Sequence, residues 1–111
     1  MEKEAQEKLH EMQTLEQQLQ QFLMQKQTFQ NDLSETESAI EALKASGDDV
    51  FKLIGQLLVK VDKKETQDEM QNRQKLIEAR LNSLEKQEEK IIKRLESLRD
   101  EVVKSMNRDK K

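Results

Sequence analysis

The sequence predicts a mainly α fold, in which two long helices form an antiparallel coiled coil and a single β-hairpin joins them. Its 111 residues include no Pro and two Gly, and 39% of them are charged. Because Pro costs about 3 kcal/mol and Gly about 1 kcal/mol in a helix interior, this composition suits long uninterrupted helices. Apolar residues recur at heptad spacing in both halves of the chain, and a stretch rich in β-forming residues lies between them.

Residues 2–46 are predicted to form the first helix, because apolar residues recur there at alternating spacings of three and four. This seam contains Ala5, Met12, Leu15, Leu19, Phe22, Phe29, Leu33, Ile40 and Leu43, with Lys8, Lys26 and Thr36 in the remaining positions. A 3.5-residue repeat of this length predicts a left-handed coiled coil. Gly47 follows, and it suits the left-handed backbone position that ends many helices.

A second helix is predicted over residues 63–107, with a frayed tail at 108–111. Asp62 with Glu65 three residues later is typical of the capping motif at a helix start. The second seam contains Met70, Ile77, Leu81, Leu84, Ile91, Leu95, Leu98 and Val102, interrupted by the polar residues Gln74, Glu88 and Ser105. Four apolar residues outside the two seams are expected to widen them, with partner binding as the alternative: Leu23, Met24, Leu76 and Ile92.

The stretch between the helices, residues 50–61, predicts a β-hairpin. Two five-residue runs rich in Val, Ile, Leu and Phe flank Gly55-Gln56, and Gly in the first central position suits a type II′ turn. Residues 50–54 then pair with residues 57–61 in antiparallel order. Both faces of this hairpin are mostly apolar, and an isolated hairpin is marginal in water, so we expect it to pair with strands from other chains.

The polar residues of the seams predict how the helices align. If the helices run antiparallel from the hairpin, the one charge in the middle of each seam, Lys26 and Glu88, falls opposite the other. The same alignment puts Lys8 beside Ser105. A polar pair inside a seam sets the register at some cost in stability, and this is the role we assign to Lys26 and Glu88.

Composition and motifs argue against several functional classes. The chain has no Cys, no apolar run near the ~20 residues that span a bilayer and no signal-peptide pattern, so we expect a cytoplasmic protein without membrane contact. Its net charge of −3, with basic and acidic residues intermixed, gives little support for nucleic-acid binding. Nucleophile–base pairs, phosphate-binding loops and metal-ligand spacings are missing, so we expect neither an enzyme nor a cofactor. The single His10 and the pair Asp48-Asp49 are interpreted as solvated and turn residues.

The order of a heptad helix, one hairpin and a second heptad helix of similar length resembles the β-type subunits of prefoldin. The most specific part is Val-Phe-Lys-Leu-Ile-Gly at 50–55 with Leu-Val-Lys-Val at 58–61, which is similar to the hairpin of that family. Residues 80–91 resemble the second helix of archaeal β subunits. The α-type subunits carry two hairpins, whereas this chain has room for one. The resemblance is therefore to a single β-type domain over residues 1–111, or to the eukaryotic subunit 6 that resembles it.

The resemblance implies an assembly and an activity. In the family, two α-type and four β-type subunits join their hairpins into a double β-barrel platform. The tips of their coiled coils hold unfolded proteins and pass them to a group II chaperonin without ATP. In this chain the platform would be built from Val50, Phe51, Leu53, Ile54, Leu57, Leu58, Val59 and Val61.

Client-binding residues are predicted at the ends of the helices far from the hairpin. The candidates are apolar: Leu9, Met12, Val102, Val103 and Met106. Leu9 and Val103 lie outside the strict seam, and exposed Met and aliphatic side chains adapt to varied apolar partners. The alternative interpretation is that these residues only complete the last heptad. A further hypothesis gives the basic tail an electrostatic role in docking to the chaperonin, through Arg108, Lys110 and Lys111.

Two other functional interpretations remain. One is a structural or tethering coiled coil that dimerises through its seams without binding clients, and the other is a basic-helix nucleic-acid binder. A tether needs only a short loop to reverse an antiparallel pair, so the hairpin favours the co-chaperone.

Overall fold

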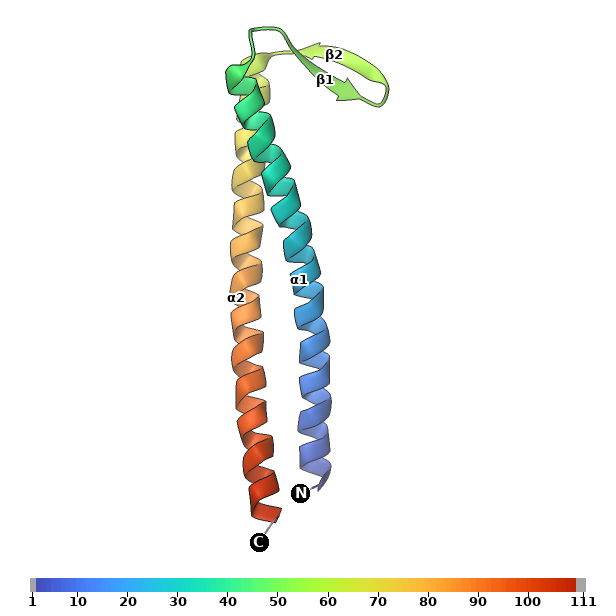
Figure 1. Ribbon diagram of the computed structural model, residues 1–111, viewed down its shortest axis with the longest axis vertical. Coiled ribbons are helices and arrows are strands. Elements are labelled where there is room, and N and C mark those ends of the chain that lie inside the picture. Colours follow the sequence, from blue (N-terminus) through green and yellow to red (C-terminus); the bar gives the residue numbers. More distant parts are fainter. Residues whose placement is uncertain (1, 110–111) are drawn as a thin grey trace. The chain divides into compact units, whose positions relative to one another are not determined.

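The structure, a computed structural model, describes residues 2–109 and confirms the predicted fold class (Figure 1). Its elements are α1 (Glu2–Ala45), β1 (Val50–Ile54), β2 (Leu57–Val61) and α2 (Lys63–Asp109). Helix α2 continues two residues beyond Asn107, the predicted end. Lys110 and Lys111 of the predicted tail lie outside the described residues.

The hairpin has the predicted register and turn. Val50 pairs with Val61 and Ile54 with Leu57, in one antiparallel ladder of five pairs. Among residues 2–109 only Gly55 has a positive φ, of 61°, so Gln56 does not. A type II′ turn requires a positive φ at its first central residue alone, and its twist matches that of the strands. Strands β1 and β2 project away from the ends of the helices that they join (Figure 1).

Side chains rather than Gly47 satisfy the end of α1, so the predicted glycine cap is wrong. The Ser46 backbone N–H and hydroxyl donate to the Leu43 carbonyl at 3.3 and 2.8 Å. The ammonium of Lys63 donates to the Ser46 carbonyl at 2.9 Å. At the start of α2, the Asp62 carboxylate accepts the Glu65 backbone N–H at 3.0 Å, as the capping motif predicts.

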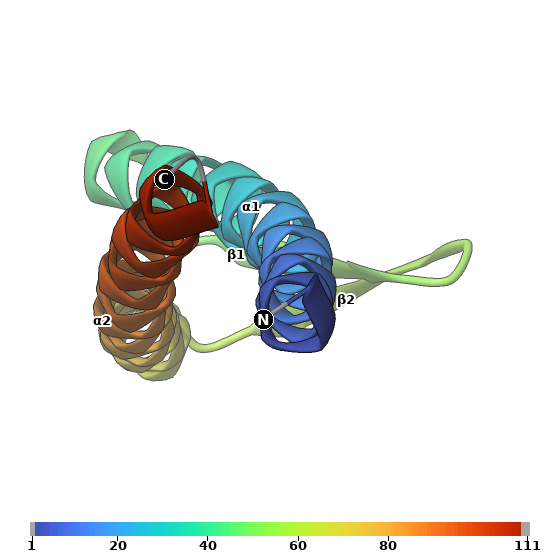
Figure 2. The same ribbon diagram turned by 90° about the horizontal axis from the view of Figure 1, so that it is seen from below.

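The chain divides into two compact units, which are described separately. The hairpin unit comprises Gln27–Leu81, with both strands and the adjoining parts of the helices. The terminal unit comprises the described residues of 1–26 and 82–111. In each unit α1 and α2 run antiparallel (Figures 1 and 2).

The predicted heptad seam is the core of each unit. The buried residues of the hairpin unit are Thr36, Ile40, Leu43, Val50 and Ile77, and those of the terminal unit are Leu84, Glu88, Ile91, Leu98 and Val102. All of these except Val50 are predicted seam positions, and the remaining seam residues are half-buried. Outside this row both helices are mostly polar, with a few exposed apolar residues, and neither helix within residues 2–109 is apolar enough to cross a membrane.

The four off-seam apolar residues do not widen the seams, so that prediction is wrong. Their exposed fractions are 47% for Leu23, 71% for Met24, 55% for Leu76 and 42% for Ile92. Two packed helices cover only the two rows of side chains that face each other. A wider apolar stripe becomes buried only when it packs against a further element.

Lys26 and Glu88 lie opposite each other inside the seam of the terminal unit. Lys26 Nζ is 3.3 Å from Glu88 Oε1, and the side chains are 22% and 11% exposed. The same oxygen is buried without a partner in hydrogen-bonding geometry, so the contact is an ion pair with poor alignment. Lys8 pairs with Glu101 at 3.5 Å, one turn before its predicted neighbour Ser105, because a long lysine side chain reaches the nearest carboxylate across a turn.

Truncating the most buried seam residue should destabilise the coil. Leu98 is 0% exposed, so we expect Leu98→Ala to cost about 2 to 5 kcal/mol through lost burial and the cavity left behind. Leu76→Ala, at a residue 55% exposed, should stay within about 0.5 kcal/mol of the parent. Urea unfolding followed by helical circular dichroism measures both, and equal midpoints would contradict a core centred on the seam.

The pair inside the seam should be more costly to break than to replace. Lys26→Leu leaves Glu88 without its counter-ion, and because both side chains are partly solvated we expect a loss of roughly 1 to 3 kcal/mol. Replacing both by Leu should restore or exceed the parent stability, since apolar residues of similar size avoid the desolvation penalty. Urea unfolding of Lys26→Leu, of Glu88→Leu and of the double variant tests the coupling. Additive losses in the double variant would mean that the two charges do not interact.

Candidate functional site

The hairpin exposes most of the side chains predicted to serve in assembly. The exposed fractions are 57% for Phe51, 67% for Leu53, 54% for Ile54, 70% for Leu57, 71% for Leu58 and 40% for Val59. Val50, at 8%, and the half-buried Val61 form the pair nearest the helices. Six large or β-branched apolar side chains on ten strand residues are far more than scattered surface apolar residues would give.

Neither face of the hairpin is suited to water. One face carries two cross-strand pairs, Phe51 with Lys60 and Leu53 with Leu58. The other carries three, Val50 with Val61, Lys52 with Val59 and Ile54 with Leu57. Each face therefore has one lysine among apolar residues, and Lys60 forms an ion pair with Asp49 at 3.2 Å. A two-stranded sheet usually solvates one face, so this hairpin is shaped for contact on both sides.

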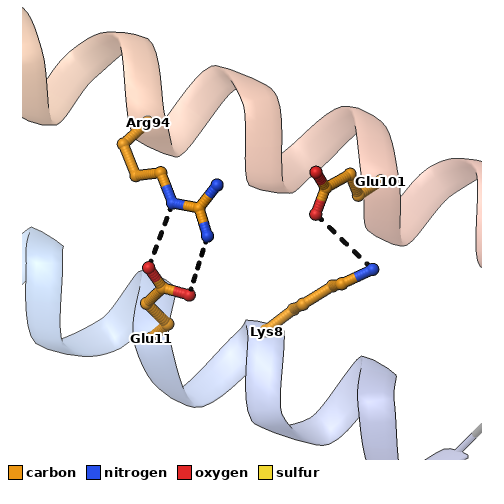
Figure 3. A network of polar contacts seen from close by, with 4 residues as sticks. All are labelled: Lys8, Glu11, Arg94 and Glu101. Carbon is orange, nitrogen blue, oxygen red and sulfur yellow. Dashed lines mark hydrogen bonds and ion pairs between the residues drawn. The ribbon is translucent and has the colours of Figure 1, made fainter.

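In each unit, ion pairs join the two helices along one side of the seam, which we call the closed flank. In the terminal unit Arg94 donates two hydrogen bonds to the Glu11 carboxylate, at 3.0 and 3.2 Å (Figure 3). The hydrogen bond from Arg94 to Glu11 is the main cause that raises the pKa of Arg94, and the charge of Glu11 adds to it. In the hairpin unit Arg73 Nη2 lies 2.7 Å from Asp32 Oδ1. These pairs are only partly buried and contribute little stability, but they mark which flank of the coil is closed.

Three of the five predicted client-binding residues lie on the surface. Leu9, Val103 and Met106 are 48%, 50% and 56% exposed. Met12 is half-buried and Val102 is only 8% exposed, so both belong to the seam. The start of α1 and the end of α2 lie at the same end of the terminal unit (Figures 1 and 2). The sequence interpretation did not place Leu23, Met24 and Ile92 on the surface. The available signal was that Leu23 and Ile92 directly follow seam residues and therefore lie beside the seam rather than in it.

Comparison with known proteins shows the family. Residues 6–108 match the profile of the family described as Prefoldin subunit. The chain is 36% identical over 101 residues to prefoldin subunit beta of Pyrococcus abyssi, covering 89% of this chain and 86% of that protein. Prefoldin subunit beta of Saccharolobus islandicus is also 36% identical, covering 89% and 80%. The crystal structure of the prefoldin beta subunit from Thermococcus strain KS-1 superposes with a TM-score of 0.84 at 33% identity, covering 92% and 91% of the two chains. The chain therefore belongs to the prefoldin subunit family, whose members act as co-chaperones rather than enzymes and assemble with other prefoldin subunits.

Proposed function

We propose that residues 1–111 act as one β-type subunit of a hexameric prefoldin, whose hairpin joins those of α-type and other β-type subunits in a β-barrel platform. The observation that carries this proposal is the hairpin, which exposes apolar side chains on both faces. Burying such surface contributes about 25 cal/mol per Å², and added strands would also pair the free backbone edges. The relatives named as beta subunits support the β type.

A tethering coiled coil is the second candidate, and it accounts for less. Such a protein would use the seams alone, and a short polar loop would suffice between its helices. It gives no reason for a ladder of five pairs, four of which carry exposed apolar side chains. The co-chaperone therefore remains the better proposal.

In this proposal the terminal unit captures non-native polypeptides and delivers them to a group II chaperonin without ATP, in the cytoplasm. The exposed Leu9, Val103 and Met106 support capture, because flexible apolar side chains adapt to irregular partners. Met12 and Val102 would join them only if the last heptad opened. The coiled coil of each subunit, which we call an arm, would bind weakly. Several arms on one client would gain affinity through effective concentration. Arg108, which is exposed near the end of α2, remains a candidate for docking to the chaperonin.

A charge placed on the hairpin should prevent assembly. Leu58 is 71% exposed, so Leu58→Asp should leave the helices intact but put a carboxylate into the proposed platform contact. We expect the parent chain mixed with an α-type subunit to reach a hexameric mass by light scattering, and Leu58→Asp to remain unassembled. Leu76→Asp is the control, because Leu76 is 55% exposed on α2 outside the hairpin. A hexamer formed by Leu58→Asp would contradict assembly through this surface.

Polar substitutions in the terminal unit should weaken client capture. Val103→Ser combined with Met106→Ser removes apolar contacts at two exposed positions and should leave the fold unchanged. Because the loss repeats on each arm, we expect the concentration that half-suppresses aggregation of a denatured protein to rise about threefold or more. Leu76→Ser should match the parent. If the double variant suppresses aggregation as well as Leu76→Ser does, the predicted client-binding residues are wrong.

A further inference from the structure

The terminal unit has one closed flank and one open flank. Glu11 and Arg94, which close the first (Figure 3), each directly precede a seam residue. Seam positions alternate between two kinds, because the next seam residue lies alternately three and four residues further on. Glu11 and Arg94 precede positions of one kind. The residues that directly follow positions of the other kind lie on the opposite side of an antiparallel pair. That side is the open flank, and it carries four exposed apolar residues: Leu9, Leu23, Ile92 and Met106.

The spacing of these four residues is regular. Leu9 and Leu23 on α1 are 14 residues apart, and so are Ile92 and Met106 on α2. Fourteen residues are two heptads, or about 21 Å along a helix. Each pair therefore returns to the same flank, and the exposed fractions of 48%, 47%, 42% and 56% are similar. Single exposed apolar residues are common on any surface, but the same 14-residue spacing on both helices and on one flank is more than scattered exposure.

Charges along the open flank define the chemistry of that partner. Glu89 lies three residues before Ile92 and Glu96 four residues after it, so both carboxylates are its neighbours on the helix surface. Three further charged residues on this flank directly follow seam residues: Glu16, Glu85 and Arg99. Together with Glu89 and Glu96 they make four acids and one base, a net charge of −3. All five are exposed.

We propose that the open flank binds a basic, apolar segment of a non-native polypeptide, with Leu23 and Ile92 forming an anchor additional to Leu9 and Met106. This inference rests on the proposed client capture and adds to it a second anchor and a preferred charge. Lysine or arginine residues between apolar ones would meet the carboxylates while the apolar side chains cover the row. A second copy of the same flank would set carboxylate against carboxylate, so charge disfavours self-association there.

Two synthetic peptides of about 16 residues, which extend to roughly 50 Å, test the proposal. Both carry Leu at every fourth position, and one has Lys and the other Glu between them. The protein is the full chain assembled with an α-type subunit, and binding is followed by fluorescence anisotropy. We expect the Lys peptide to bind about fivefold tighter or more at low salt, and salt to reduce the difference because the charges are exposed.

Three variants assign this binding to the flank. Leu23→Ser with Ile92→Ser should weaken the Lys peptide about threefold or more, because one of two linked anchors is lost. Leu76→Ser, at a residue that is also exposed (55%) but lies in the hairpin unit, should change nothing. Glu89→Gln with Glu96→Gln should reduce the preference for Lys over Glu.

The outcomes separate this inference from the function on which it rests. Equal binding of the two peptides, or a flank variant that behaves like Leu76→Ser, overturns the inference. If the unmodified assembly still suppresses aggregation of a denatured protein in the same preparations, only the inference fails. If it neither binds a peptide nor suppresses aggregation, the proposed client capture fails as well.

Discussion

The hairpin imposes the constraint on which the rest of the structure depends, because six of its apolar side chains, spread over both faces, stay exposed within residues 2–109. Five ladder pairs hold the two strands in register, but two strands alone bury little surface. The helices cannot provide the cover, since their apolar rows already face each other. We propose that other chains supply this cover, since prefoldin subunits assemble with one another, and that the hairpin becomes part of a larger sheet.

The terminal unit divides its surface between stability and contact. The apolar seam supplies the stability, with Leu98 fully buried. We propose that Lys26 and Glu88, which lie opposite each other inside it, set the alignment of the helices more than they add stability. Exposed ion pairs such as Arg94 with Glu11 add little to stability, but they occupy one flank. The other flank keeps its apolar and acidic side chains free for a partner. A coil of only two helices makes this division possible, because a third helix would bury the open flank.

Much of the fold follows from local pattern in the sequence. The turn glycine between two equal apolar runs leaves one hairpin register, and the heptads leave one buried row on each helix. The exposure of Leu23 and Ile92 did not follow, because an apolar residue beside a seam is compatible with either a wide or a narrow seam until the number of packed helices is known. The end of α1 did not follow either, since Lys63 reaches the Ser46 carbonyl from 17 residues away. Assembly and client contacts depend on other chains, so the sequence of one chain predicts only which surfaces are available for them.

Hydrogen exchange of the hairpin amides gives the most direct test of whether other subunits cover the hairpin. It compares residues 50–61 in the isolated chain and in a mixture with an α-type subunit. Assembly through the hairpin predicts fast exchange in the isolated chain, because a two-stranded sheet opens readily, and strong protection in the mixture. Protection that is the same in both samples, while the mixture has assembled, would contradict a platform built from this hairpin.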